Sequence, residues 1–399
     1  MDATYEYIAA ITIFSLMIGF SLISVSSLSS TQLKIMYGEQ LRPVAEKLLD
    51  KILLTPGYPE NWGTNIYVND SSLKDIGLSL GSGEMFEIDA DKLQRLVGNA
   101  VENPLYISPL ILGNLTGIYS RNYGWKYGFN LKVISALVIE NITSVSIDSG
   151  GLYKFRVKTY KGEPAPNAKV NAFFFRIGVY KDGKQYTFDT NSSVLENITN
   201  WRGEVEFNFV GRAPTLPPAK GSQEFTSACL IVTAKYYGLQ SQNIWYGKGT
   251  LLLSLEIYGQ YLAAKFTEVP EFPNFARHIT HARNYTVIGF TTSLTQVFYS
   301  FEEVTNSEEG NVINRGGKSY RVYKLTEHVP NDLMFVGLVV RHGNNYYFVF
   351  ASRPRVPIAL NYSSGNVPYA GIKTETVERL VRIGLNSYYV ELTLWRTAE

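Results

Sequence analysis

The chain has 399 residues, which at roughly 100–200 residues per domain corresponds to two or three domains. Apolar residues make up 45% of the chain and charged residues 18%, so hydrophobic cores are expected and global disorder is excluded. A net charge of +2 argues against a mainly electrostatic nucleic-acid binder. A single cysteine excludes an internal disulfide framework and any cysteine-rich metal site.

The N-terminus carries the strongest single feature. No charged residue occurs in the segment Tyr7–Leu33. As an α-helix, Ile8–Leu28 would span about 31 Å at ~1.5 Å per residue, which matches a hydrocarbon core of ~30 Å. A cleaved signal peptide fits less well, because Asp2 and Glu6 precede the apolar run where a basic region would be needed. The pattern predicts a long hydrophobic N-terminal helix.

An amphipathic stretch follows this helix. Its apolar residues recur every three or four positions and form one stripe: Leu41, Val44, Leu48 and Ile52. Pro43 either kinks a continuous helix or starts a new one, and Thr55-Pro56-Gly57 ends it. Residues 1–55 are therefore predicted to form an apolar rod that continues into an amphipathic stalk.

The N-terminal residues also resemble a known family. Asp2-Ala-Thr-Tyr-Glu6-Tyr before an apolar helix resembles the mature start of archaeal type IV pilin-like proteins, whose fifth mature residue is often acidic. The segment LDKILLTPGYPENWG (Leu49–Gly63) resembles the LLLTPGxPxNW segment of archaeal pilin-like and anchored surface proteins, and Ile76–Leu96 is similar to them as well. No basic leader precedes Asp2: the leader is absent from this sequence, or only Met1 is removed, or the chain is an anchored relative that never enters a filament.

The resemblance implies a structural role without catalysis. The chain would be a subunit of an extracellular pilus-like filament on an archaeal cell, with N-terminal helices in the core and β domains forming an adhesive outer surface. The partner would be a second copy of the chain, bound through this helix, after residence in the membrane. In pilins the carboxylate at the position of Glu6 pairs with a neighbour's N-terminal amine, and small residues such as Gly19 and Ser21 let helices pack closely.

The middle of the chain has a β pattern. After Asp148, apolar and polar residues alternate between turn signals. GEPAPNAKV (Gly162–Val170) and WRGEVEFNF (Trp201–Phe209) resemble strands of bacterial Ig-like and prealbumin-like surface modules, which implies an Ig-like sandwich over about 144–262. The predicted fold class is mainly β, with a long N-terminal hydrophobic α-helix and one or more Ig-like β-sandwich extracellular domains.

Two further parts flank the sandwich. Residues 56–143 are expected to form a small α/β segment, with a helix at Asp89–Val97 capped by Asp89 or Asp91. Residues 263–399 are expected to form a second β-rich domain or to complete the first. The predicted strands here are Tyr123–Ser144, Tyr285–Phe301, Ser319–Leu325, Leu333–Arg341, Tyr346–Ala351 and Arg379–Trp395, the last turning near Asn386.

The location of the body is inferred from acceptor sites for N-linked glycans. Basic residues after the apolar segment would by themselves favour the cytoplasm, but this charge rule is weak for large domains. Seven Asn-X-Ser/Thr sequences favour a glycosylated, extracellular surface. They start at Asn69, Asn114, Asn141, Asn191, Asn197, Asn284 and Asn361.

Patterns that would indicate an enzyme are weak. His278 and His281 have a spacing seen in zinc sites but lack an obvious third ligand, and Cys229 lies in an apolar strand typical of a core. The acidic stretch Glu302–Glu309 is expected to be a solvated loop, with calcium binding as the alternative. No catalytic residue, metal site or cofactor is predicted.

Two alternatives to the filament remain open. The first is a single-pass anchored surface protein, an envelope component or adhesin, that does not polymerise. The second is an anchored enzyme or solute receptor, which requires a site that the sequence does not reveal.

Overall fold

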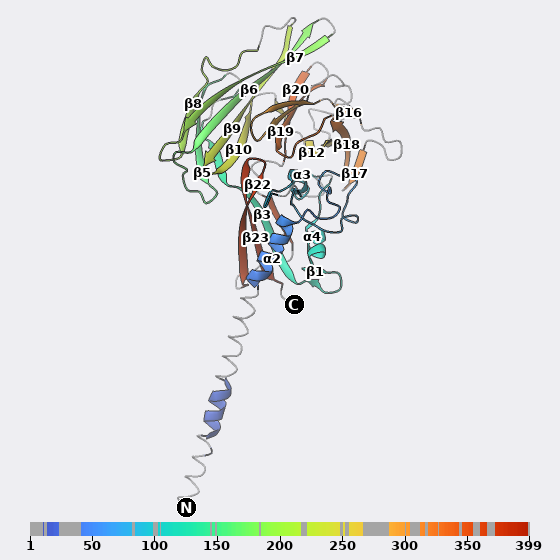
Figure 1. The fold of residues 1–399 in the computed structure, drawn as a ribbon, viewed down its shortest axis with the longest axis vertical. Coiled ribbons are helices and arrows are strands. Elements are labelled where there is room, and N and C mark those ends of the chain that lie inside the picture. Colours follow the sequence, from blue (N-terminus) through green and yellow to red (C-terminus); the bar gives the residue numbers. More distant parts are fainter. Residues whose placement is uncertain are drawn as a thin grey trace, which may run out of the picture.

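The computed structural model is mainly β, with a body built of several packed sheets (Figure 1). This confirms the coarse fold class expected from the alternating pattern. The residues that the structure describes are 11, 14–23, 41–81, 84–98, 103, 105–143, 146–147, 150–182, 185–216, 222–247, 250–251, 255–265, 287–299, 301–303, 312–315, 318–325, 327–342, 345–353, 360–364 and 372–397.

The sheet nearest the N-terminal segment is built from both ends of the chain. It has the order β21-β3-β23-β22, and all its pairs are antiparallel. The strands are β21 (Leu360–Ser364), β3 (Tyr127–Ser135), β23 (Asn386–Arg396) and β22 (Thr374–Ile383). The last two form the predicted hairpin, which turns at Gly384 and Leu385, directly before Asn386. The C-terminal strands thus complete a sheet that β3 begins.

Helix α2 (Leu41–Leu54) packs on this sheet against β22 and β23. Pro43 lies in its first turn, where the missing N–H leaves no hydrogen bond unmade. The predicted apolar stripe faces the core: Leu41, Leu48 and Ile52 are buried, as are Ala45, Leu49 and Leu53. The expectation of a stalk is therefore wrong for α2, because the folded body covers its apolar face.

Two sheets form a β-sandwich in the middle of the chain. One has the order β10-β9-β6-β7 and the other β4-β5-β8, and side chains from both share a single core. Their bounds are β4 (Leu137–Asn141), β5 (Leu152–Thr159), β6 (Lys169–Asp182), β7 (Gln185–Ile198), β8 (Glu204–Asn208), β9 (Ser222–Tyr236) and β10 (Leu239–Tyr246).

A third layer covers the outer face of the sandwich. The side chains of successive residues in a strand point to opposite faces, so Phe174 enters the sandwich core while Phe173 and Phe175 point the other way. Both of these rings meet Phe290 of β14 (Val287–Thr291), at centroid distances of 5.8 and 5.0 Å. Strand β6 is buried on both faces here, which explains the four consecutive apolar residues Ala172–Phe175.

Strand β14 belongs to the first of two sheets whose strands all lie after residue 249. Their orders are β11-β20-β19-β14-β15 and β12-β13-β18-β16, and β17 also pairs with β18. The remaining bounds are β11 (Thr250–Leu251), β12 (Leu255–Tyr258), β13 (Tyr261–Lys265), β15 (Gln296–Tyr299), β16 (Phe301–Glu303), β17 (Val312–Arg315), β18 (Lys318–Leu325), β19 (Leu333–His342) and β20 (Asn345–Ser352). Glu302 and Glu303 lie in β16, so the expected acidic loop is wrong at its start.

Short elements complete the part between α2 and β3. Helix α3 (Ala90–Gln94) is shorter than predicted, and Asp89 is its N-cap. Helix α4 (Pro109–Thr116) ends at Gly117, whose φ of 75° suits glycine, and leads into the hairpin of β1 (Tyr119–Ser120) and β2 (Gly124–Trp125). The core of this part continues into the C-terminal sheet and the outer face of the sandwich.

The N-terminal prediction is met only in part. Residues 14–23 are helical within the stretch 8–28 that was expected to be one helix. Across the described residues, no helix has both the length and the apolar character needed to cross a membrane.

Candidate functional site

The described N-terminal helix exposes apolar side chains in every direction. Residues 14–23 lie beyond the lower end of the body in Figure 1, apart from its sheets. Successive helical residues turn by about 100°, so seven large apolar residues within ten positions surround the axis. These exposed residues are Phe14, Leu16, Met17, Ile18, Phe20, Leu22 and Ile23. A helix that is apolar all round requires cover from lipid or from other protein.

Two of the predicted assembly residues lie on this helix. A Cβ added at Gly19 would meet no heavy atom within 4 Å, and Ser21 is exposed. No described part of the body occupies the surface beside either residue. Glu6 lies outside the described residues. Gly19 and Ser21 are therefore placed where a second helix has access to them.

Helix α2 connects this segment to the body at one end of the molecule. Arg379 of β22 binds the Asp50 carboxylate, with Nε 3.0 Å from Oδ1. This ion pair sets the second half of α2 beside the middle of β22. Figure 1 shows α2 starting at the end of the body that faces the N-terminal helix. A force on the helix would reach the body through α2 and its sheet.

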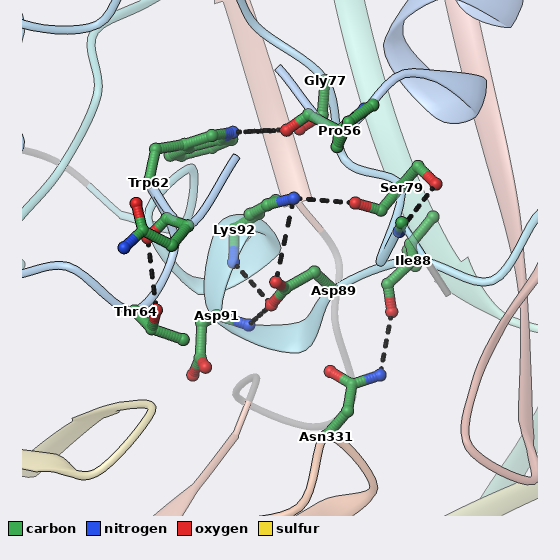
Figure 2. A network of polar contacts seen from close by, with 12 residues as sticks. Pro56, Trp62, Thr64, Gly77, Ser79, Ile88, Asp89, Asp91, Lys92 and Asn331 are labelled. Atoms are coloured by element: carbon green, nitrogen blue, oxygen red, sulfur yellow. Dashed lines mark hydrogen bonds and ion pairs between the residues drawn. The ribbon is translucent and has the colours of Figure 1, made fainter. Parts of the chain in front are cut away.

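The segment Leu49–Gly63, which carries the pilin-like resemblance, is tightly packed. The Trp62 indole is fully buried and its Nε1 donates to the carbonyl oxygens of Pro56 and Gly77, both at 3.1 Å (Figure 2). Gly57 has a φ of 77°, and a Cβ there would lie 2.9 Å from the Trp62 Nε1. The Arg95 guanidinium donates to the carbonyl oxygens of Trp62 and Leu105. The segment thus serves the fold immediately after α2.

Charged groups are buried around α3, next to this segment. The Lys92 ammonium donates to the Ser79 carbonyl at 2.7 Å and lies 3.9 Å from the Asp89 carboxylate (Figure 2). Burial lowers the pKa of Lys92, and burial together with the Asp91 charge raises the pKa of Asp89. Asp91 receives two hydrogen bonds from Arg353, at 2.5 and 2.6 Å. The Asp91–Arg353 pair joins α3 to the chain directly after β20. We therefore assign these buried charges a structural role rather than a catalytic one.

The predicted glycan acceptors differ in whether the side-chain amide nitrogen already donates a hydrogen bond within the protein. Asn69 and Asn114 are exposed, and the Nδ2 of neither donates a hydrogen bond to a described residue. In contrast, the Nδ2 of Asn191 donates to the Thr215 carbonyl at 2.7 Å, and that of Asn197 to the Glu206 carbonyl at 3.1 Å. Among the acceptors whose side chains the structure describes, Asn69 and Asn114 are the exposed ones with an uncommitted amide.

The other three acceptors are less informative. Asn141 is half-buried at the end of β4, and its Oδ1 accepts from the Thr143 N–H at 2.9 Å. Asn361 is in β21, paired with Lys132, and its side chain lies outside the described residues. Asn284 also lies outside them.

Of the residues considered for enzyme chemistry, the structure describes Cys229 but not the two histidines. Cys229 is buried in β9, and burial raises the pKa of its thiol, which confirms it as a core residue. Within the described ranges, no three His, Cys, Asp or Glu residues are close enough to hold a metal ion. His278 and His281 lie outside those ranges.

An aromatic pocket is a feature that the sequence analysis missed. It has a volume of about 670 Å³ and lies between the end of α4, the β1–β2 hairpin, the start of β3 and the end of β23. Its side chains include Tyr119, Tyr123, Trp125, Lys126, Tyr127 and Arg396. The signal was the run YSRNYGWKY (Tyr119–Tyr127), with four aromatic residues in nine, of which the sequence analysis predicts only a strand from Tyr123 onward.

Comparison with known proteins adds no relative. No model of a known protein family matches the chain, and no curated protein matches its sequence. The resemblance to pilin-like proteins therefore depends on the quoted N-terminal residues alone.

Proposed function

We propose that this chain is the structural subunit of an extracellular pilus-like filament on an archaeal cell. Its N-terminal helices would pack together as the filament core, and the β body would form the outer, adhesive surface. The observation that carries the proposal is the helix at 14–23, whose large apolar side chains are exposed on all sides. A core made of such helices covers every one of these surfaces.

The energetic reason is the cost of leaving apolar area in water. Each Å² of apolar surface removed from water contributes roughly 25 cal/mol. Lipid covers the helix before assembly, and neighbouring helices cover it in the filament. Transfer of the helix from the membrane into the filament therefore leaves little apolar surface exposed to water in either state. Gly19 supports this reading, because its lack of a side chain permits close approach of a second helix.

The body supports the proposal through its sandwich. In chain order the strands β4 to β10 correspond to the seven strands of an immunoglobulin constant domain. The sheets differ from that domain at one strand: β7 pairs with β6, whereas the fourth strand of a constant domain lies in the opposite sheet. This order favours an Ig-like module, which is the kind of unit that surface proteins use as an outer domain.

Electron microscopy tests the proposal directly. Surface material sheared from producing cells is examined by negative stain, and mass spectrometry identifies the chain in the filaments. Filaments that contain this chain are expected. If the chain remains in the detergent-solubilised membrane fraction and no filaments form, the filament is excluded and the chain is a single-pass anchored surface protein.

Variants of the helix separate assembly from anchoring. Gly19→Leu is expected to abolish filaments and leave membrane extraction unchanged, because the open space beside Gly19 in the monomer tolerates a side chain. Phe20→Leu is the matched control on the same helix and should still assemble. Glu6→Ala should also block assembly without affecting insertion, and normal filaments in that variant would remove the role of Glu6.

A further inference from the structure

The pocket beside the β1–β2 hairpin has preformed aromatic walls. Tyr119 and Trp125 are paired across the hairpin, with ring centroids 4.9 Å apart. The Trp125 ring lies against Gly113 of α4, where a Cβ would come within 2.4 Å of it. The Thr397 hydroxyl donates to the Trp125 carbonyl, so the end of the chain also holds this residue in place. The two rings are therefore fixed before any ligand arrives.

The described part of the lining is positively charged. Ten of the described residues line the pocket, and these ten include two cations, Lys126 and Arg396, and no carboxylate. The Lys126 ammonium lies 5.6 Å from the centre of the Tyr127 ring and is exposed. Tyr123, at the tip of the hairpin, is 90% exposed, although large aromatic side chains are usually at least half covered. An exposed tyrosine beside a cation and a fixed tryptophan makes a surface that is ready to bind.

We propose that this pocket binds an acidic saccharide that carries uronate groups. A pyranose ring has one face lined by C–H groups, which packs against an aromatic ring, and hydroxyl groups that bind tyrosine and threonine. Its carboxylate would meet Lys126 and Arg396. The volume of about 670 Å³ is within the range of small-ligand sites, ~300–1,000 Å³, and accommodates a short oligosaccharide.

Two sources of such a saccharide share this chemistry. One is an external glycan that is not attached to this protein. The other is a glycan attached to the protein itself, because Asn114 is exposed on α4 only three residues before Gly117, which lines the pocket. The proposal does not rest on filament assembly, and it adds a ligand class to the outer surface of the body.

The test measures binding of trigalacturonate to the full chain in a non-ionic detergent, by calorimetry and by tryptophan fluorescence. Binding is expected to weaken with rising salt, because charge contributes to it. Neutral maltotriose should bind at least about tenfold more weakly. Equal affinity for the two sugars would overturn the assignment of an acidic ligand.

Matched variants locate the site. Lys126→Gln is expected to weaken trigalacturonate binding about threefold to tenfold. Lys74→Gln should leave it unchanged, although Lys74 also lies over a tyrosine ring, at 5.7 Å. Tyr123→Ala should reduce binding, whereas Tyr237→Ala, which removes a tyrosine that is also 90% exposed, should not. Equal effects within either pair would place the binding elsewhere.

Two further arms identify the source and the competing class of partner. If the Asn114→Gln variant binds trigalacturonate and the wild-type protein does not, a glycan on Asn114 occupies the pocket of the wild-type protein. If the variant and the wild-type protein both bind trigalacturonate, the ligand is an external glycan. Vesicles that contain phosphatidylglycerol are the second arm. One outcome is that the vesicles bind the wild-type protein but not the Lys126→Gln variant, while trigalacturonate binds neither the wild-type protein nor the Asn114→Gln variant. In that case the pocket is a lipid-headgroup site and the proposal is wrong.

Discussion

At the scale of single residues, the unusual feature of this protein is the set of charges buried around α3. Asp89 caps the helix, with its Oδ1 accepting from the N–H groups of Asp91 and Lys92 at 2.8 and 3.3 Å. Burial and the neighbouring Asp91 raise the Asp89 pKa above its usual 3.8, while Lys92 and Arg353 act in the opposite sense. The folded protein therefore holds a proton on Asp89 at pH values where the unfolded chain has lost it.

This difference predicts a pH dependence of stability. Because the folded state binds more protons in the window above pH 3.8, the free energy of unfolding falls as pH rises from about 4 through the folded pKa. Asp89→Asn retains a good N-cap and removes the titration, so its stability should vary less with pH in this range. The measurement is the melting temperature between pH 4 and 7.

The control for this experiment is Asp75→Asn. Asp75 is partly exposed and pairs with Lys51 at 3.0 Å. This variant controls for the loss of one carboxylate outside the buried cluster. If Asp89→Asn leaves the slope of melting temperature against pH unchanged from that of the wild type, Asp89 does not titrate in the window that its burial implies.

At the scale of elements, strand β6 decides how the body is assembled. Alternate residues of β6 enter two different cores, and β9 does the same, with Leu230 in the sandwich core and Cys229 and Ile231 in the other. A two-layer sandwich in isolation would expose one of these faces. The three layers therefore depend on the contact between this face and Phe290 of β14.

Phe175→Ala tests the third layer. Phe175 is fully buried, so the loss of its ring should lower the free energy of unfolding by about 3–5 kcal/mol. Val194→Ala on the neighbouring strand β7 is the control, because Val194 is more than half exposed and its loss should cost under about 0.5 kcal/mol. Urea unfolding of both variants gives the comparison, and similar small losses would mean that β14 contributes little to the fold.

At the scale of the whole molecule, segments from the first third and from the end of the sequence are built together. Strand β3 pairs with β23 in one sheet, and helix α2 packs against β22 and β23. The sandwich lies between these segments in sequence and shares the same large core through Phe173 and Phe175. Consecutive segments of the sequence therefore do not form separate domains, because they share one core.

Excision of the sandwich tests this arrangement. A fragment of residues 137–247 contains all seven sandwich strands but leaves the outer face of β6 and β9 uncovered. The fragment is expected to self-associate in size-exclusion chromatography. The same fragment with Phe173→Ser and Phe175→Ser should elute as a monomer. If the unmodified fragment is already monomeric, the sandwich is independent of the third layer.

Local patterns in the sequence predicted several features correctly. Asp89 or Asp91 was expected as the cap of α3, and Asp89 is the cap. The prediction was possible because an aspartate side chain can satisfy the first free N–H groups of a helix, which depends only on nearby residues. The apolar stripe of α2 and the strands β18, β19 and β20 followed from periodicity. The aromatic pocket did not, because the run Tyr119–Tyr127 forms a pocket only where Arg396 and Thr397, more than 260 residues later, complete its wall.

The sequence by itself determined the mainly β character of the chain, its apolar N-terminal segment and the burial of Cys229, because these follow from composition and from the spacing of neighbouring residues. Only the tertiary structure decided that α2 packs on a sheet, that β6 is covered on both faces and that Arg353 pairs with Asp91. Each of these depends on contacts between segments far apart in the chain. Such contacts are selected by the burial of apolar area and the pairing of buried charges, for which one segment alone carries no information.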